Sequence, residues 1–419
     1  MRVLFSVAPF TAHLYPSVPL AWALQSAGHE VRLAGNTSMA ERITAAGLTA
    51  VRLGEAATAP PSFPQEERDR FTEALGFEPG SDHGLLWESV APYVALNVTR
   101  YHPDAEGRQG LADNLVEFAR DWRPDLVIWD PASPIGSVAA RESGAASARL
   151  MWGPDYFGLA QWRLAERLSR GDIRTHPLAD LMAPVFRRFG YDFSEDMLLG
   201  DLTVDPIPRQ LPRPEGHRTL PMRWVPYTGS APVPDWLVQP PSRPRVCLSL
   251  GITARTVFAG RDERIVAVLE AVADMDVEVV ATVNADQLGE DMKVPDNVRI
   301  LDYVPLTQVM PTCSAIIHHG GFGTLFAAAA CQVPQMIIKE NIGSALCSAP
   351  YLESRGAGVA LPVEGLTAAQ VGGELSRMLT EPSFRQGAAA VYADMTAAPG
   401  PGEIVPILER LAGQYRTRD

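Results

Sequence analysis

The sequence predicts an α/β protein built from two doubly wound, Rossmann-like domains that face each other across a cleft. In both halves of the chain, short continuous apolar runs alternate with stretches of helical periodicity, as in parallel sheets covered on both faces. Eleven prolines within residues 205–245 interrupt this alternation and mark a domain boundary. Parallel β-α-β units bind ligands at the carboxyl ends of their strands, so functional residues are expected there.

The first half contains five apolar runs that we expect to be strands, separated by helices. The strands are predicted at 2–8, 30–34, 48–53, 126–129 and 149–152, and the helices at 17–27, 39–46, 84–98, 110–121 and 135–143. Gly28 and Gly47 each follow a predicted helix, at the position where glycine commonly ends one. Residues 55–82 are rich in Pro, Glu and Gly without periodicity, which predicts a long mobile excursion.

The second half repeats the pattern with six predicted strands, and helix is expected in the gaps and at the end of the chain. These strands are predicted at 246–250, 277–281, 298–301, 315–317, 335–338 and 358–361. We expect an amino-terminal domain over 1–215, a proline-rich linker over 216–245 and a carboxyl-terminal domain over 246–400. The last stretch, 401–419, is predicted to be a helix that crosses back to the amino-terminal domain.

The composition excludes several classes of function. The 419 residues include 36 Lys and Arg against 49 Asp and Glu, and the net charge of −13 argues against binding nucleic acid or an anionic membrane. Only Lys293 and Lys339 are lysines and no G-K-[ST] occurs, which argues against Schiff-base chemistry and a P-loop. The four cysteines lack C-x-x-C spacing, and Asp274-Met275-Asp276 has the character of a solvated turn, so no metal site is predicted. Without disulfides or an apolar run of about 18 residues, the protein is expected to be soluble and cytoplasmic.

The most specific segment is IIHHGGFGT, residues 316–324, in which a predicted strand runs into a glycine-rich turn and then a helix over 325–331. The glycines of this turn are Gly320, Gly321 and Gly323. Glycines let the backbone approach an anion closely, and a helix N-terminus offers free N–H groups and a partial positive charge. His319 can add a side-chain donor, and Thr324 is expected to cap the helix. The pattern favours a phosphate site over a turn that is merely tightly packed.

Two further stretches of the second half lie at the carboxyl ends of predicted strands. Gly251 and Thr253 follow the strand at 246–250, where they can meet a phosphate or form an ordinary βα turn. The loop LDYVP at 301–305, which includes Val304, has a backbone that can pair with the edge of a nucleobase.

A histidine and an aspartate in the first half form the candidate catalytic pair. His13 lies in the predicted loop after the first strand, and Asp130 follows the strand at 126–129. If the two strands share one edge of the sheet, the carboxylate can orient the imidazole and stabilise its charged form. The alternatives are a surface loop histidine and an aspartate that starts a turn before Pro131.

These features resemble those of antibiotic-pathway glycosyltransferases, which are inverting enzymes of the two-domain GT-B architecture that use nucleotide-activated deoxysugars. The resemblance rests on RVLF at 2–5, His13, Pro16, LAWALQSAGHEV at 20–31, WRPDLVIWDP at 122–131, HHGGFGT at 318–324 and CQVPQ at 331–335. It extends over nearly the whole chain and is weakest over 55–110 and 155–205.

The resemblance implies a role for each candidate residue. His13 would be the general base that deprotonates an acceptor hydroxyl, with Asp130 as its partner. The diphosphate would be held by His319, Gly320, Gly321, Gly323 and Thr324, with Gly251 and Thr253 opposite, and Val304 would contact the base, usually thymine. The co-substrate is then a nucleotide sugar, and no cofactor or metal is required if the helix dipole and His319 stabilise the leaving diphosphate.

One loop departs from the family pattern. Family members commonly carry an acidic residue there that contacts sugar hydroxyls, whereas this chain has Ile338-Lys339-Glu340-Asn341-Ile342-Gly343, with Gly343 at the place where Asp is common. Glu340 and Asn341 can serve as the sugar contacts instead. The departure favours a donor with a less hydroxylated deoxysugar or an aminodeoxysugar.

The sequence therefore predicts a glycosyltransferase that moves a deoxysugar from a thymidine diphosphate donor to a hydroxyl of a macrolide-like or other polyketide natural product. The alternatives are a nucleotide-sugar epimerase, a non-catalytic nucleotide-sugar-binding subunit, and C- in place of O-glycosylation. Besides the aglycone and the nucleotide sugar, the partners to consider are a cytochrome-P450-like auxiliary protein and a second copy of the chain in a homodimer. The aromatic residues that can line an aglycone pocket, or belong to the core, are Phe10, Trp87, Tyr93, Trp152 and Tyr156.

Overall fold

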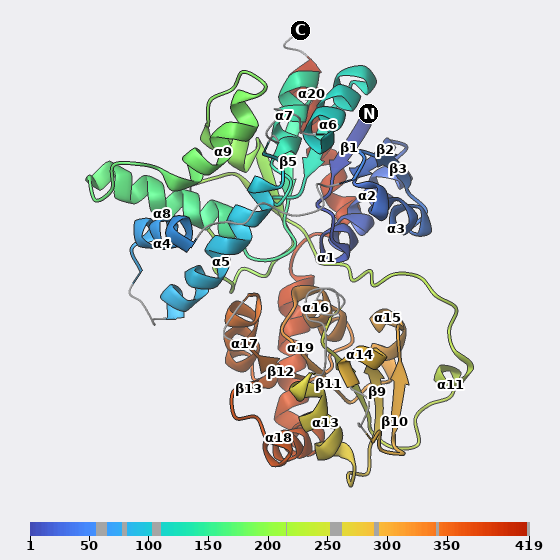
Figure 1. Ribbon diagram of the computed structural model, residues 1–419. Coiled ribbons are helices and arrows are strands. Elements are labelled where there is room, and N and C mark those ends of the chain that lie inside the picture. Colours follow the sequence, from blue (N-terminus) through green and yellow to red (C-terminus); the bar gives the residue numbers. More distant parts are fainter. Residues whose placement is uncertain are drawn as a thin grey trace. The chain divides into compact units, whose positions relative to one another are not determined.

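The computed structural model describes residues 1–55, 65–77, 82–102, 110–214, 216–251, 262–288, 293–340 and 343–416. The chain divides into two compact units (Figure 1). Unit 1 comprises Met1–Arg223 and Ala398–Asp419, and unit 2 comprises Trp224–Ala397. Each unit contains its own parallel sheet flanked by helices, which confirms the predicted pair of doubly wound α/β domains.

In the described part of unit 1, the sheet has seven parallel strands in the order β3-β2-β1-β4-β5-β6-β7. They are β1 (Arg2–Ser6), β2 (Glu30–Gly35), β3 (Thr49–Arg52), β4 (Leu126–Trp129), β5 (Ala146–Leu150), β6 (Leu202–Asp205) and β7 (Thr219–Pro221). The strand order reverses where β1 pairs with β4, with Ser6 opposite Trp129. In open α/β sheets this reversal is the point at whose carboxyl edge ligands bind.

Helices surround this sheet and tie the carboxyl terminus to it. They are α1 (Thr11–Leu14), α2 (Val18–Ser26), α3 (Ala40–Ala45), α4 (Gln65–Leu75), α5 (Asp82–Thr99), α6 (Gly110–Trp122), α7 (Ile135–Ser143), α8 (Tyr156–Arg170), α9 (Pro177–Arg187), α10 (Glu195–Leu199) and α20 (Pro401–Arg416), with 3₁₀ turns at Tyr15–Ser17 and Thr37–Met39. Helix α20 packs against α2 within unit 1. His29 Nε2 lies 3.0 Å from Glu409 Oε1 and adds a polar contact between the two parts of the chain.

The expected excursion at 55–82 contains a packed helix, so the prediction of a mobile segment without regular structure is wrong over Gln65–Leu75. Helix α4 buries Phe71, Ala74 and Leu75, whose spacing of three and four residues forms one helical face. It packs against α5, α8 and α9, and Arg163 Nε donates to the Leu75 carbonyl at 3.0 Å. The apolar pattern of this face is hard to recognise in the sequence, because prolines flank the helix and a run of charged residues precedes Phe71. Residues 56–64 and 78–81 lie outside the described residues.

Unit 1 also differs from the predicted elements at its far edge. Strand β5 covers Ala146–Leu150, so the predicted strand at 149–152 begins three residues too late. The sequence pattern does not predict β6 and β7, and β7 follows a run of prolines that disfavours central strands. Among the described strands, β7 is the last of the sheet and pairs with β6 alone, and such an edge position tolerates a strand that contains proline.

Over the residues of unit 2 that the structure describes, the sheet has six parallel strands in the order β10-β9-β8-β11-β12-β13. All six predicted strands are present: β8 (Arg245–Ser249), β9 (Glu278–Thr282), β10 (Val298–Leu301), β11 (Ala315–His318), β12 (Gln335–Lys339) and β13 (Gly358–Pro362). The helices are α11 (Asp235–Val238), α13 (Glu263–Val272), α14 (Ala285–Leu288), α15 (Leu306–Val309), α16 (Phe322–Ala329), α17 (Ala345–Ser354), α18 (Ala368–Thr380) and α19 (Pro382–Thr396), with a 3₁₀ turn at Met310–Thr312.

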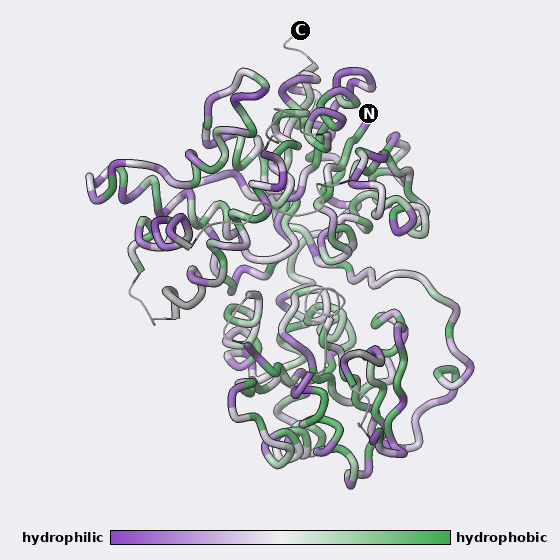
Figure 2. Tube along the Cα trace, viewed as in Figure 1, coloured by the Kyte–Doolittle hydropathy of each residue, from purple (hydrophilic) through white to green (hydrophobic). Residues whose placement is uncertain are grey.

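Alternate residues of the unit 2 strands enter two apolar clusters on opposite faces of the sheet. Leu248 and Ile317 pack with α13 and α18 on one face, and Cys247 and Ile316 pack with α15 and α16 on the other. In Figure 2, hydrophobic residues are concentrated along strands of this unit, such as β9 and β10, and hydrophilic residues are found mainly in the surrounding segments. No helix in the described ranges is long and apolar enough to cross a membrane.

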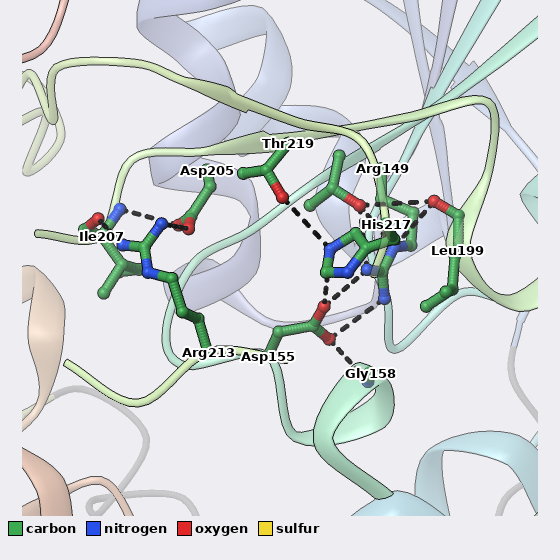
Figure 3. A network of polar contacts seen from close by, with 10 residues as sticks. Arg149, Asp155, Gly158, Leu199, Asp205, Ile207, Arg213, His217 and Thr219 are labelled. Atoms are coloured by element: carbon green, nitrogen blue, oxygen red, sulfur yellow. Dashed lines mark hydrogen bonds and ion pairs between the residues drawn. The ribbon is translucent and has the colours of Figure 1, made fainter. Parts of the chain in front are cut away.

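A buried polar network joins three elements at the carboxyl edge of the unit 1 sheet (Figure 3). Arg149, near the end of β5, is completely buried and pairs bidentately with Asp155, with Nη1–Oδ1 at 3.0 Å and Nη2–Oδ2 at 2.5 Å. Arg149 Nε also donates to the Leu199 carbonyl and to Thr203 Oγ1, both at 3.1 Å. Asp155 is the N-cap of α8, and it accepts from the Gly158 amide at 2.8 Å. Arg149 and Asp155 together thus link β5, β6 and the start of α8.

A second carboxylate in the same network fixes the segment that follows β6. Asp205 accepts from Arg213 Nη1 at 3.1 Å and from the Ile207 amide at 2.9 Å. Burial raises the pKa of Asp205 to about 6, although Arg213 and the Ile207 amide favour the charged form. Asp205 therefore binds its proton more tightly in the folded protein than in the unfolded chain.

This raised pKa predicts that unit 1 loses stability as the pH rises from about 4 to about 6. Over that range the folded state holds more protons than the unfolded state at Asp205, so the free energy of unfolding falls, by about 2–3 kcal/mol in total. The measurement is urea unfolding between pH 4 and pH 7 for the wild type and Asp205→Asn, since other groups titrate equally in both. We expect the difference between the two proteins to change across this range, and a constant difference would contradict the assignment.

Candidate functional site

The residues that follow β1 and β4 form a close polar pair. His13 Nδ1 lies 2.6 Å from Asp130 Oδ2, and both residues are buried, at 7% and 6% exposure. They meet because β1 and β4 are hydrogen-bonded neighbours, so the segments after them leave from the same edge of the sheet. His13 lies in the short helix α1, and the prediction of a loop there is wrong.

The surroundings of Asp130 fix the orientation of the imidazole. Asp130 Oδ1 accepts from Trp152 Nε1 at 3.2 Å and from the Ala132 amide at 2.8 Å, while Oδ2 faces His13. A carboxylate held in this way accepts the Nδ1–H of a neutral histidine, which leaves the lone pair on Nε2. His13 Nε2 can therefore take a proton from a bound molecule.

Three aromatic side chains surround His13. The Trp152 ring lies 4.2 Å and the Phe10 ring 5.3 Å from the imidazole ring, measured between centroids. The Tyr93 hydroxyl lies 3.3 Å from His13 Nε2. Burial, followed by the charge of Asp130, raises the pKa of Tyr93 well above its usual value, so the phenol stays protonated and donates to Nε2. The sequence marked these aromatic residues only as pocket or core candidates, because α5 and the segment after β5 reach His13 through tertiary packing.

Of the other aromatic candidates, two lie in the core. Trp87 is buried and stacks on Phe77 with ring centroids 6.0 Å apart, and Tyr156 is buried at the start of α8.

The glycine-rich turn of unit 2 joins β11 to α16. The helix begins at Phe322 with Gly321 as its N-cap, three residues earlier than predicted. Thr324 is therefore not the cap: it lies in the first turn of α16 and is buried. His318 is buried at the end of β11, and its Nδ1 lies 3.2 Å from the Gly320 amide nitrogen. Burial, with a contribution from His319, lowers the pKa of His318 to about 3, so this ring is neutral and can accept from Gly320.

His319 occupies a slot that two glycines leave open. A Cβ atom on Gly251 would lie 2.4 Å from His319 Cε1, and a Cβ on Gly321 would lie 2.5 Å from His319 Nε2. Gly251 also has a φ of +86°, which other residues rarely adopt. Gly251 and His319 are neighbours because β8 pairs with β11, with Ser249 opposite His318. Any larger residue at either glycine would displace the imidazole.

His319 is neutral at physiological pH. Burial, and after it the positive charge of Arg264, lowers the pKa of His319 to about 4. Within the described residues, its Nδ1 is buried without a hydrogen-bond partner. A neutral imidazole carries one N–H that can donate to a phosphate but no charge, so the positive potential for a phosphate at this turn would come from the N-terminus of α16.

The remaining candidates of unit 2 have less distinctive surroundings. Val304 packs its side chain into the apolar cluster on the α15 face, so only its backbone is available to a nucleobase. Glu340 follows β12, and its Oε1 lies 2.7 Å from Arg264 Nη1. Thr253 and Asn341 lie outside the described residues. Across the described ranges, no three His, Cys, Asp or Glu side chains are grouped so that they could hold a metal ion.

Comparisons with known proteins agree with this organisation. Residues 22–251 match the amino-terminal domain model of the erythromycin biosynthesis protein CIII-like family, and residues 266–411 match its carboxyl-terminal domain model. The chain is 40% identical to aclacinomycin-T 2-deoxy-L-fucose transferase of Streptomyces galilaeus, over 99% of this chain and 97% of that protein. It is also 40% identical to 10-deoxymethynolide desosaminyltransferase of Streptomyces venezuelae, over 99% and 98% of the two chains.

A solved structure has the same fold over its full length. The crystal structure of glycosyltransferase VinC in complex with dTDP superimposes with a TM-score of 0.81 at 35% identity, covering 99% of this chain and 100% of that one. The two parallel sheets, the full-length identity and both family models lead to one conclusion. This chain belongs to the erythromycin biosynthesis protein CIII-like family, GT-B glycosyltransferases of macrolide and anthracycline deoxysugar pathways.

Proposed function

We propose that this enzyme transfers a deoxysugar from a dTDP donor to a hydroxyl of a polyketide aglycone, with inversion at the anomeric carbon and His13 as general base. Relatives that are about 40% identical are named for transfer of 2-deoxy-L-fucose and for transfer of desosamine to 10-deoxymethynolide. VinC, a structural neighbour, was solved with dTDP. These names support the class of donor and acceptor.

Unit 1 supplies the group that activates the acceptor. The observation that carries the proposal is the 2.6 Å contact between His13 and Asp130, because it leaves the Nε2 lone pair as the proton acceptor. As the acceptor oxygen attacks the anomeric carbon, its proton moves to Nε2, and Asp130 stabilises the imidazolium that results. A protein that only binds a nucleotide sugar has no need for such a pair.

Unit 2 supplies the groups that hold the donor. The diphosphate would accept from His319 and from the backbone N–H groups at the start of α16, with Gly320, Gly321, Gly323 and Thr324 forming the turn and Gly251 and Thr253 opposite. Negative charge grows on the diphosphate as the glycosidic bond breaks, and these fixed donors stabilise it without a metal ion. The Val304 backbone would meet the thymine, and Glu340 with Asn341 the sugar.

Selective stabilisation by thymidine diphosphate tests the donor assignment. We expect dTDP to raise the melting temperature more than uridine, guanosine or adenosine diphosphate, since a ligand at 100 times its Kd adds about 2.7 kcal/mol to the free energy of unfolding. His319→Ala should reduce the dTDP shift without changing the melting temperature of the free protein by more than a few degrees. Equal shifts from all four nucleotides, or an unchanged dTDP shift in His319→Ala, would refute this part of the proposal.

Product analysis then tests transfer itself. Incubation with a dTDP-deoxysugar and a polyketide aglycone should give dTDP and a glycoside of inverted anomeric configuration, whereas an epimerase would isomerise the nucleotide sugar without an acceptor. The reaction is run with and without a cytochrome-P450-like auxiliary protein. An O-linked product that forms only with the aglycone present supports the proposal, and an isomerised donor contradicts it.

A further inference from the structure

Arg264 forms a buried ion-pair cluster at the carboxyl edge of the unit 2 sheet. It is the second residue of α13, and its side chain is only 8% exposed. Its Nε lies 2.9 Å from Asp262 Oδ1 and its Nη2 lies 2.6 Å from Asp262 Oδ2, which is a bidentate pair. Its Nη1 lies 2.7 Å from Glu340 Oε1. One guanidinium therefore binds two carboxylates from different elements.

The cluster carries more negative than positive charge, which makes a purely stabilising role costly. Arg264 contributes one positive charge, while Asp262 and Glu340 contribute two negative charges. Burying such groups requires desolvation, and well-packed apolar residues often stabilise a fold as well as a buried ion pair does. Asp262 alone would satisfy the helix cap, since it accepts from the Arg264 amide at 3.0 Å. The second carboxylate, that of Glu340, does not cap this helix, so helix capping does not explain its presence in the cluster.

Glu340 is the member of the cluster that a ligand can reach. Its side chain is 29% exposed, against 14% for Asp262 and 8% for Arg264. Arg264 engages Oε1, so Oε2 is the oxygen best able to accept from a ligand hydroxyl or ammonium group. Arg264 is also near enough to His319 for its charge to lower the pKa of that ring. The same guanidinium thus contacts the proposed sugar ligand, Glu340, and shifts the pKa of His319.

We propose that Arg264 is a positioning residue that holds the Glu340 carboxylate in the orientation required to bind the sugar of the donor. The inference rests on the proposed function, because it assigns Glu340 to the sugar. Arg264 contacts Asp262 and Glu340 with its Nε, Nη1 and Nη2 groups, so it acts through Glu340 and not on the diphosphate. A carboxylate held before substrate arrives loses less conformational freedom on binding, which strengthens each hydrogen bond that it makes.

The inference predicts that Arg264 affects recognition of the sugar but not of the nucleotide. In Arg264→Gln, we expect the affinity for the dTDP-sugar and its kcat/KM to fall by about tenfold to a hundredfold, as for loss of a hydrogen bond to a charged group. The affinity for dTDP, which lacks the sugar, should change by less than about threefold. Arg264→Lys keeps the positive charge but cannot make the bidentate contacts of a guanidinium, so it should restore only part of the affinity for the dTDP-sugar.

A double-mutant cycle with Glu340→Gln separates positioning from other roles. If Arg264 acts through Glu340, the double variant Arg264→Gln/Glu340→Gln should bind the dTDP-sugar no more than about threefold more weakly than Glu340→Gln alone. Glu340→Gln retains the buried arginine, so it also provides a variant that does not depend on the stability of Arg264→Gln. Arg377→Gln, which breaks an ion pair that is about half exposed on α18, is the matched control and should change neither affinity.

The charge of Arg264 has its own measurable effect at His319. NMR titration of the histidine rings should show a higher pKa for His319 in Arg264→Gln than in the wild type, and little change in Arg264→Lys. This readout does not depend on turnover.

Other outcomes would overturn the inference. Losses that multiply in the double variant would show that Arg264 and Glu340 act independently. An equal loss of dTDP and dTDP-sugar affinity would show that Arg264 serves the nucleotide site or the fold. If the wild type binds the dTDP-sugar no better than dTDP, the sugar assignment of Glu340 fails and this inference fails with it. A wild type that binds both tightly but transfers nothing contradicts the proposed function alone.

Discussion

Replacing His13 with alanine is expected to lower kcat by about 10²–10⁴-fold, the range in which general-base assistance usually falls. The reason is that His13 Nε2, oriented by the 2.6 Å contact between Nδ1 and Asp130, is the proposed proton acceptor, and alanine would leave the acceptor hydroxyl without that base. The affinity for dTDP should be unchanged, because the residues proposed to bind the diphosphate belong to unit 2 and His13 belongs to unit 1. Steady-state turnover with saturating donor and aglycone, together with calorimetric titration of dTDP, provides both numbers.

Three further variants show whether the base or its surroundings cause the loss. Asp130→Asn keeps the shape but weakens the stabilisation of the imidazolium, so we expect an intermediate loss of kcat. Tyr93→Phe removes the hydroxyl that lies 3.3 Å from Nε2 while keeping the ring, and turnover should change by less than about tenfold. His102→Gln, a histidine whose Nε2 lies 2.8 Å from the Leu181 carbonyl, is the matched control. Turnover of His13→Ala within about tenfold of the wild type would show that His13 is not the base.

The His13–Asp130 contact could be anticipated because it follows from topology alone. Asp130 comes directly after β4, and His13 lies in α1, the first helix after β1. Doubly wound sheets put β1 beside β4. The same reasoning brings Gly251 and His319 together, since β8 pairs with β11. Site residues that follow adjacent parallel strands are therefore accessible to sequence analysis.

Contacts that depend on the packing of helices were not accessible in this way. Tyr93, on α5, contacts His13, and Arg264, on α13, contacts Glu340. Neither contact can be predicted from the spacing of these residues in the sequence. Helix α4 is not predicted for a related reason. Its apolar face consists of only Phe71, Ala74 and Leu75, and these residues are buried by packing against α5, α8 and α9, which the sequence does not show. The sequence could show that an arginine or tyrosine was present but not what it would meet.

The buried arginine of unit 1 leads to the second large effect. We expect Asp155→Ala to reduce the free energy of unfolding of unit 1 by about 3–5 kcal/mol, the usual cost of leaving a buried charge without its partner. Arg149 is completely buried, and its bidentate contact with Asp155 is its only ion pair among the described residues. The same substitution removes the N-cap of α8, which adds about 1 kcal/mol.

A double variant separates the loss of the buried ion pair from the loss of the α8 N-cap, and a surface variant serves as the control. Arg149→Met/Asp155→Ala removes both charges and should recover most of the loss, because the remaining groups are then apolar or neutral. Glu381→Gln breaks an exposed ion pair with Arg377 and should cost less than about 1 kcal/mol. Amide hydrogen exchange in β5 and β6 reports the opening of unit 1 separately from that of unit 2. A loss below about 1 kcal/mol in Asp155→Ala would show that Arg149 finds other partners or water.

The Arg149–Asp155 pair also bears on catalysis, because it fixes both ends of a short segment. Trp152 lies between these two residues in the sequence, and its Nε1 donates to Asp130 at 3.2 Å while its ring packs 4.2 Å from His13. Removing the Asp155 carboxylate should therefore loosen Trp152 and, through it, the orientation of Asp130. We expect Asp155→Ala to lower kcat even at temperatures where it remains folded, and Arg149→Met/Asp155→Ala to recover stability more fully than turnover. If turnover followed stability in every variant, the pair would support the fold but not the geometry of the candidate base.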